Sequence, residues 1–191
     1  MSCDESLTVS FAPACSALKK PAGFQNFGYI GTISDLASVT YATGAIAALT
    51  FTGTKVLTKF ATNERQVMAP SPINDRGEGG FSTVTHTVNL PIYFDTQAEL
   101  NAAETVIQAD KLFVILPTSD MKFRCYGLAG VPYDIKNFGL NNSGGEDAPG
   151  QVLNDVTRLN LVLTGEMLNL PQFFLDTDYA TSLALLEGYL A

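Results

Sequence analysis

The stretch that decides the fold is Phe81-Ser-Thr-Val-Thr-His-Thr-Val-Asn-Leu-Pro-Ile-Tyr-Phe94. Its apolar and polar side chains alternate, which is typical of a strand with one buried face. One face carries Val84, Val88, Leu90, Ile92 and Phe94, and the other carries Thr83, Thr85, Thr87 and Asn89. The pattern therefore predicts a long strand packed on a core through one side.

The residues before this strand also favour β structure. Segments 28–33, 45–52 and 54–60 are rich in Thr, Val, Ile and aromatic residues, which fit a pleated surface. Residues 69–80 contain two prolines and three glycines, so we expect a long, mobile loop there. The sequence thus predicts a long hairpin of 54–68 with 80–94, capped by that loop.

After the strand the hydrophobic period changes to that of a helix. Thr96 and Glu99 have capping-box spacing, and apolar residues then recur every three or four positions as far as Ile107. We expect one amphipathic helix over 96–109. A buried strand over 111–116 and a further strand over 121–127 follow it.

The last third alternates between glycine-rich and apolar sequence. Residues 139–150 hold four glycines and a proline and predict a second long loop, whereas 156–164 alternate like a strand. Asp176-Thr-Asp-Tyr179 is suited to cap a short helix through Leu190. Its apolar face (Tyr179, Leu183, Leu186) has no evident partner nearby in the sequence, which suggests contact with a neighbouring chain.

Length and composition fit one domain with arms. The chain has 191 residues, of which 46% are hydrophobic and 16% charged, so a folded core is expected. We predict an N-terminal arm over 1–27, a β-rich core over 28–168 and a C-terminal arm over 169–191. The expected fold class is mainly β (α+β): a β-sandwich or barrel with one packed α-helix, a long hairpin loop and extended terminal arms.

The charge balance argues against several functions. A net charge of −8 gives no strong attraction to nucleic-acid phosphates. The first residues lack the pattern of a secretory signal, and we expect no membrane span. The chain has three widely spaced cysteines, so we do not expect a disulfide framework. Assembly in a reducing cytosol is therefore expected.

Residues suited to catalysis are few. His86, the single histidine, shares the face of Val84 and Val88 and is interpreted as a packed core or interface residue. The acidic pairs Asp176/Asp178 and Glu146/Asp147 lack the spacing of a calcium loop. No nucleophile elbow or phosphate-binding loop is present. We therefore expect neither an enzyme nor a bound cofactor or metal.

The order of segments resembles a known family. It is carried by Gly23–Ile30, helix 98–109, Lys111–Leu116, Met121-Lys-Phe-Arg-Cys-Tyr-Gly-Leu128 and Leu159-Asn-Leu-Val-Leu-Thr-Gly-Glu166. The chain is similar to virion structural proteins of tailed phages and prophages of Bacteroidetes-type hosts, and more loosely to phage tail-tube proteins. The likeness covers about residues 1–170.

The resemblance implies a tail-tube-like fold whose copies form stacked, usually sixfold rings around a channel that conducts DNA. It implies a virion location, assembly in the host bacterial cytoplasm, and partners such as sheath, terminator or baseplate proteins. DNA would pass without specific binding. Implied contacts between subunits or rings are Pro70, Pro72, Ile73, Arg76, Phe81, Phe173, Phe174, Tyr179, Leu183 and Leu186. Acidic candidates for the lumen are Glu146, Asp147 and Asp155.

Other roles also fit the sequence. A tail terminator, a head–tail connector or a capsid-associated protein would share this order of elements. A monomeric β-sandwich module for binding or adhesion is a further alternative. The absence of Trp and the core-like positions of Phe94, Phe113 and Phe123 argue against a sugar-binding module.

Overall fold

The computed structural model describes residues 23–53, 57–62, 67–75, 82–93, 96–128, 138–148, 158–175 and 178–190. A short 3₁₀ turn, Ile33–Asp35, joins the first two strands. The strands are β1 Phe27–Thr32, β2 Leu36–Ala42, β3 Ala45–Phe51, β4 Thr58–Ala61, β5 Val84–Tyr93, β6 Leu112–Pro117, β7 Phe123–Tyr126, β8 Asn141–Ala148, β9 Arg158–Met167 and β10 Gln172–Phe174; the helices are α1 Gln97–Gln108 and α2 Tyr179–Glu187.

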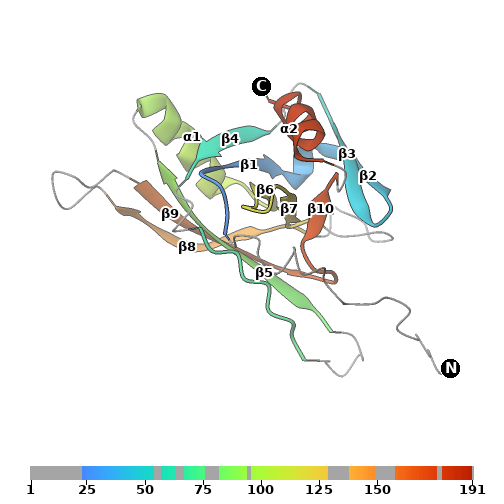
Figure 1. Ribbon diagram of the computed structural model, residues 1–191. Helices are drawn as coiled ribbons and strands as arrows, with labels where there is room; N and C mark the ends of the chain where they lie inside the picture. Colours follow the sequence, from blue (N-terminus) through green and yellow to red (C-terminus); the bar gives the residue numbers. More distant parts are fainter. Residues whose placement is uncertain are drawn as a thin grey trace.

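Two sheets and two helices form a layered sandwich. The larger sheet has the order β2-β3-β10-β7-β6-β1-β4, and the smaller one has the order β5-β9-β8. Figure 1 shows the larger sheet above the smaller one, with α2 on its far side and α1 at one end of the sandwich. The predicted mainly β, sandwich-like class is confirmed, whereas the sheets do not close into a barrel.

Strand β6 lies near the middle of the larger sheet and is buried along its whole length. Leu112, Val114 and Leu116 face the core between the two sheets. Phe113 and Ile115 face a second core beneath α2. A strand covered on both faces needs apolar residues at successive positions, which explains the unbroken run that predicted a buried strand here.

The long strand predicted from the alternating pattern is also confirmed. β5 pairs antiparallel with β9 over ten residues, from Val84 opposite Met167 to Tyr93 opposite Arg158. Val88, Leu90 and their β9 neighbour Leu161 face the core between the sheets. The small sheet therefore buries one face and leaves the other on the outside.

Helix α1 begins as the sequence indicated. The Thr96 hydroxyl accepts a hydrogen bond from the Glu99 amide at 3.3 Å, and the Glu99 carboxylate accepts one from the Thr96 amide at 3.1 Å. This capping box satisfies two amides that the first turn leaves unpaired. Ala103 is buried, and Val106 and Ile107 pack against the core between the sheets.

The predicted hairpin has a different first strand. β4 pairs with β1 in the larger sheet, so residues 58–61 are not the partner of β5. That partner is instead the segment 67–75, which is joined to β5 by bridges from Met68 to Asn89 and from Ile73 to Val84. The prediction of a loop over 69–80 is therefore wrong for residues 69–75, which lie extended along β5.

The prediction of a second loop over 139–150 is also wrong for most of that range. Residues 141–148 form β8, which pairs antiparallel with β9 around a bulge between Asn142 and Gly144. At Gly145 the backbone has φ +157°, and a Cβ would lie 2.4 Å from the Asn160 carbonyl oxygen. Glycine is required there because the two strands approach too closely for a side chain.

The C-terminal segment belongs to the core. β10 lies between β3 and β7, and α2 covers the adjoining face of the sheet. Phe174 and Leu186 are 1% and 0% exposed and pack in the core beneath α2. The expectation of a C-terminal arm with an apolar face for a neighbour is therefore wrong, and so is the assignment of these two residues to a contact between subunits.

The described part of the predicted N-terminal arm also joins the core. Phe24 forms a bridge with Thr118, and the Gln25 amide donates to the Pro117 carbonyl at 2.8 Å. Residues 1–22 lie outside the described residues, as do three of the predicted contact or lumen residues, Arg76, Phe81 and Asp155.

Candidate assembly surface

The outer face of the small sheet is a continuous surface over four strands, on which Thr and Asn side chains are mixed with apolar ones. The segment 67–75 adds a fourth strand beside β5, so the order becomes 67–75, β5, β9, β8. Rows of side chains cross this face, for example Pro70, Thr87, Thr164 and Asn141. Asn74 extends the face toward the hairpin end, because its amide donates to the hydroxyls of Thr83 and Thr85 at 2.9 Å each.

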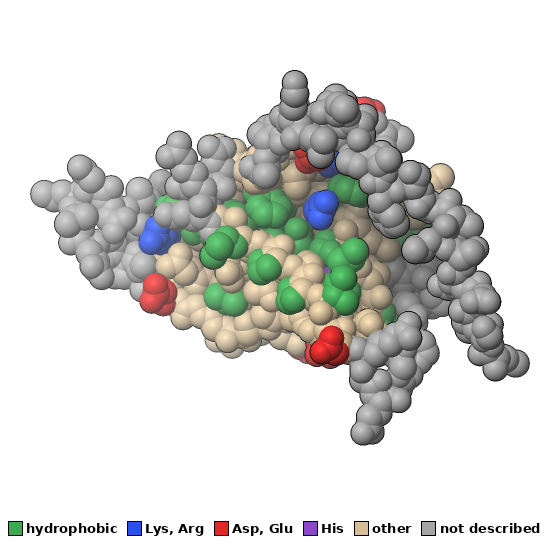
Figure 2. Space-filling model, turned by 60° about the horizontal axis from the view of Figure 1, so that its bottom comes forward, with side chains coloured by type: hydrophobic (Ala, Val, Ile, Leu, Met, Phe, Trp, Pro, Cys, Tyr) green, Lys and Arg blue, Asp and Glu red, His purple; other side chains and the backbone are tan. Residues whose placement is uncertain are grey.

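This outer face carries little charge. Among its described positions, the charged ones are Arg158, Glu146 and Glu166. Figure 2 shows a few charged side chains on this side of the molecule, with hydrophobic and other uncharged side chains spread between them. Such a surface has no strong electrostatic attraction for a polyanion.

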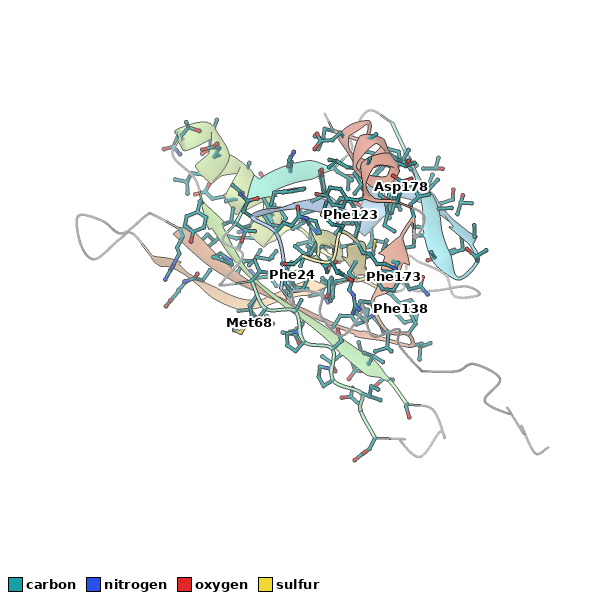
Figure 3. The ribbon with its side chains drawn as sticks, in the orientation of Figure 1. Phe24, Met68, Phe123, Phe138, Phe173 and Asp178 are labelled. Atoms are coloured by element: carbon teal, nitrogen blue, oxygen red, sulfur yellow. The ribbon has the colours of Figure 1, made fainter. Side chains whose placement is uncertain are left out.

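Two large apolar side chains are exposed on the hairpin. Figure 1 shows β5 and the accompanying segment running beyond the body of the sandwich. Met68 is 59% exposed and Ile73 is 66% exposed. Figure 3 places Met68 on the outer side of the small sheet. Exposed apolar residues on a projecting element are typical of a contact with another chain.

The backbone N–H groups on the outer edge of the segment 67–75 are able to pair with another strand. Alternate residues face β5, and the Pro70 and Pro72 carbonyls accept bonds from Thr87 and Thr85 at 3.1 and 3.0 Å. Both prolines therefore stand at positions where an N–H group would point toward β5, and proline has no N–H to donate there. The amides that point away from β5 belong to Ala69, Ser71 and Ile73, all of which can donate.

This arrangement is the reverse of the usual edge protection. Proteins commonly place prolines or lysines so that the outer edge of a sheet cannot pair. Here the prolines remove two hydrogen bonds from the pairing with β5, and every N–H group on the outer edge of residues 69–73 is retained. Among the described residues, no strand pairs with that outer edge.

The opposite edge of the same sheet is β8. It pairs with β9 on one side, and no described strand covers its other side along its length. Residues 141–146 are all exposed. The small sheet therefore has two edges able to pair, one formed by 67–75 and the other by β8.

A groove adjoins the outer edge of 67–75. It measures about 610 Å³ and lies between the base of the hairpin, at Ala69 and Ser71, and the underside of the larger sheet. From the larger sheet come Arg124, Tyr126 and Phe173. Burial raises the pKa of Tyr126 to about 12, so its hydroxyl is protonated at neutral pH and is able to donate a hydrogen bond.

His86 fills a core position close to this region, as the sequence indicated. The ring is fully buried and lies edge-on to Tyr126, with 5.8 Å between ring centroids. Its Nδ1 accepts from the Gly127 amide at 3.2 Å, and its Nε2 donates to the Asn169 carbonyl at 2.9 Å. Burial lowers the pKa of this histidine.

The predicted contact residues fall into two groups. Pro70, Pro72 and Ile73 lie together on the exposed hairpin. Tyr179 and Leu183 belong to α2: Tyr179 stacks on Phe123 with 5.0 Å between ring centroids, and Leu183 packs on the same core. Both side chains contact the chain's own larger sheet and keep part of their surface.

The remaining predicted residues lie on β8 and β10. Glu146 is exposed on the outer face and accepts a hydrogen bond from Asn160 at 3.3 Å. Asp147 is paired with Leu159 in the ladder. Phe173 is half-buried at the groove.

The sequence did not predict two residues of this surface, Met68 and Arg124, as contact residues. Met68 was assigned to a strand paired with β5 but not to a contact, and Arg124 was assigned only to a strand. The signal for Arg124 was its alternation with Lys122 on a strand otherwise apolar. Two cations on one face of a core strand indicate that this end of the face is reached by solvent or by a partner.

Within the described residues, no group of three or more His, Cys, Asp or Glu is placed to hold a metal ion. No described helix is long and apolar enough to cross a membrane. Comparisons with protein-family models, curated proteins and solved structures found no match.

Proposed function

We propose that this chain is a structural subunit of a phage virion, the tail-tube protein, whose copies form stacked rings around a channel that conducts DNA. The observation that carries the proposal is the small sheet with its hairpin strand. It combines an outer face of low charge with two edges that are able to pair. The resemblance in the order of elements supports the same role.

The number of strands favours a ring. Directions alternate across 67–75, β5, β9 and β8, so the two edge strands run in opposite directions. When copies are related by rotation, β8 of one copy meets 67–75 of the next in antiparallel orientation. A repeat of four strands thus keeps the pairing antiparallel all the way round, and closure removes every open edge of this sheet.

The dimensions are compatible with a DNA channel. Six copies, the symmetry that the resemblance implies, supply about 24 strands; at ~4.8 Å per strand they enclose a ring about 37 Å across before tilt widens it. The weakly charged outer face would line this channel. Thr and Asn side chains there, with few charges, would let phosphates slide past without holding them.

The test is the assembly state of the full chain. We expect rings or tubes of constant diameter in negative-stain electron micrographs, and a mass of several subunits by light scattering at raised concentration. A chain that stays near 20 kDa at all concentrations would contradict the proposal and favour a monomeric binding module.

A matched pair of variants separates edge pairing from apolar contact. Ile73→Pro removes an outward N–H, whereas Ile73→Thr keeps it and shortens the apolar side chain. We expect rings from the Thr variant and monomers from the Pro variant, with both chains folded by circular dichroism. Equal assembly of the two would show that the outer edge of 67–75 is not the interface.

A further inference from the structure

A pocket lies between helix α1 and the strands beside it. Figure 1 shows α1 next to β4 at one end of the sandwich. The pocket measures about 180 Å³, and its lining includes Ile30 from β1, Phe60 from β4, Ile92 from β5, and Ala103 and Val106 from α1. All five side chains belong to the core between the sheets or pack against it. We call this space the α1 pocket.

The helix leaves this space because its side chains there are small. Ala102 and Ala103 both line the pocket, and Ala103 is the buried residue of α1. An alanine side chain ends at Cβ and fills little of the gap between a helix and a sheet. The larger side chains of Val106 and Ile107 pack on the core about one turn further along the helix. The pocket therefore follows from the sequence of α1, and a larger residue at position 103 would fill it.

The charged groups that line the pocket are already engaged. They are Lys59 and Glu99, which are exposed and therefore lie at its mouth. Lys59 Nζ donates a hydrogen bond to the Glu187 carboxylate at 2.6 Å and lies 5.0 Å from the centre of the Phe27 ring. The Glu99 carboxylate accepts a hydrogen bond from the Thr96 amide in the capping box. Both charges thus have partners outside the pocket, so neither favours a charged ligand.

The buried lining of the pocket offers little to water. A buried water needs about two to four polar partners. The described buried polar side-chain atoms that lack a hydrogen-bond partner belong to Ser71, Asn89 and Gln172, and none of these three residues lines the α1 pocket. The buried residues of its lining, such as Ile30 and Ile92, are apolar. Carbon atoms match such a surface better than water does.

We propose that the α1 pocket binds a small uncharged apolar molecule about the size of benzene. An apolar cavity of about 150 Å³ stays dry and takes up benzene. The α1 pocket, at about 180 Å³, is slightly larger. The ligand would contact the helix and the strands together, so its binding would stabilise the packing of α1. This site does not depend on the assembly of copies.

The test is a titration of the full chain with benzene, followed by methyl NMR. The methyl signals of Ile30, Ile92 and Val106 should shift, and the shifts should saturate within the solubility of benzene. Ile46 and Leu49 are buried in the other core, beneath α2, and their signals should stay unaltered. The thermal unfolding midpoint should rise with the benzene concentration, because the ligand binds the folded chain.

A matched pair of alanine variants locates the site. Ala103→Leu places a larger side chain in the pocket and should weaken benzene binding by at least about tenfold. Ala98→Leu makes the same exchange at an exposed position of α1 that does not line the pocket, and it should leave binding unaltered. Val106→Ala widens the pocket and should raise the preference for p-xylene over benzene, which keeps the test decisive if Ala103→Leu does not fold.

A matched pair of ligands tests the chemical class. Benzoate has the same ring as benzene with a carboxylate added, and burying that charge without a partner is costly. Lys59 is held by Glu187, so it does not offset this cost. Benzoate should therefore bind at least about tenfold more weakly than benzene.

The outcomes are distinct. Saturable shifts at the pocket methyl groups, lost in Ala103→Leu and kept in Ala98→Leu, would support the site. Absence of a saturable shift in the unaltered chain would overturn it, and so would equal shifts at Ile46 and Leu49, since benzene would then enter the cores without a defined site. Benzoate that binds as tightly as benzene would overturn the uncharged class of ligand. None of these results bears on the proposed assembly.

Discussion

At the scale of single residues, His86 is a buried neutral base held between two backbone groups. Nδ1 accepts from Gly127 and Nε2 donates to Asn169, so a second proton would set two N–H groups against each other. Burial lowers its pKa in the folded chain below the ordinary value of 6.5. The unfolded chain therefore binds a proton first as the pH falls.

The resulting prediction concerns stability between pH 7.5 and 5.5. The contribution of His86 is fully present above pH 6.5 and decreases as the pH falls below it, so the urea midpoint should drop over this window. His86→Gln should flatten the dependence. Because the chain has one histidine, NMR of its imidazole gives the pKa directly, and a value above 6.5 would contradict this account.

Two neighbouring glycines of β8 form a matched pair. Gly144 and Gly145 have φ of +155° and +157°, so alanine meets the same backbone strain at both. A Cβ at Gly144 meets open space, whereas one at Gly145 meets the Asn160 carbonyl oxygen at 2.4 Å. Gly145→Ala should cost about 1–3 kcal/mol more than Gly144→Ala in chemical denaturation. Equal losses would mean that β8 and β9 move apart at little cost.

At the scale of elements, packing holds α2 on the larger sheet more than its ion pair does. Leu186 is fully buried, and Leu186→Ala should cost about 2–5 kcal/mol of unfolding free energy. The Lys59–Glu187 pair is exposed on both sides, so Lys59→Met should cost less than about 1 kcal/mol. Leu186→Met is the volume control, and a larger loss for Lys59→Met than for Leu186→Ala would contradict this order.

The elements that the sequence predicted are those whose reason is local. Thr96 and Glu99 cap α1 within one turn, and the alternation of β5 follows from its own side chains. Asp178 likewise caps α2 within one turn: its side chain accepts a hydrogen bond from the Thr181 amide, as its sequence position indicated. In each case the deciding contact is within a few residues along the chain.

The elements that the sequence missed depend on distant partners. β8 has a composition typical of loops, and it is a strand because β9 supplies its ladder and glycine permits the close approach at Asn160. Pro70 and Pro72 suggested a loop, but their missing N–H groups cost only two bonds when β5 donates to their carbonyls. The apolar face of α2 found its partner in a sheet assembled from strands far apart in sequence.

The candidate assembly surface likewise has a part that was named from the sequence and a part that was not. Pro70, Pro72 and Ile73 were named as candidate contacts from the resemblance, and the structure places them together on the exposed hairpin. The groove was not named, since Ser71 and Arg124 come together only when the two sheets stack. A site made between layers leaves no spacing that a linear pattern reveals.

At the scale of the whole molecule, the two sheets differ in how much of each is covered by the rest of the chain. The larger one is covered on both faces, by the small sheet and by α2, and gives the chain a core of its own. The small sheet has one covered face and two edges able to pair. The chain can therefore fold as a single copy, and in the proposed assembly it would still gain backbone hydrogen bonds when copies meet.

Amide hydrogen exchange reports this directly. The amides of Met68 and Asn74 donate to β5 within one copy and should be protected at every concentration. Those of Ala69, Ser71 and Ile73 point outward and should exchange rapidly in dilute protein but about tenfold more slowly in the proposed rings, where they would pair with β8 of the next copy. Met68 and Asn74 serve as internal controls on the same strand. If the outward amides exchange equally fast in both states, the rings are held by side chains and the channel is not one continuous sheet.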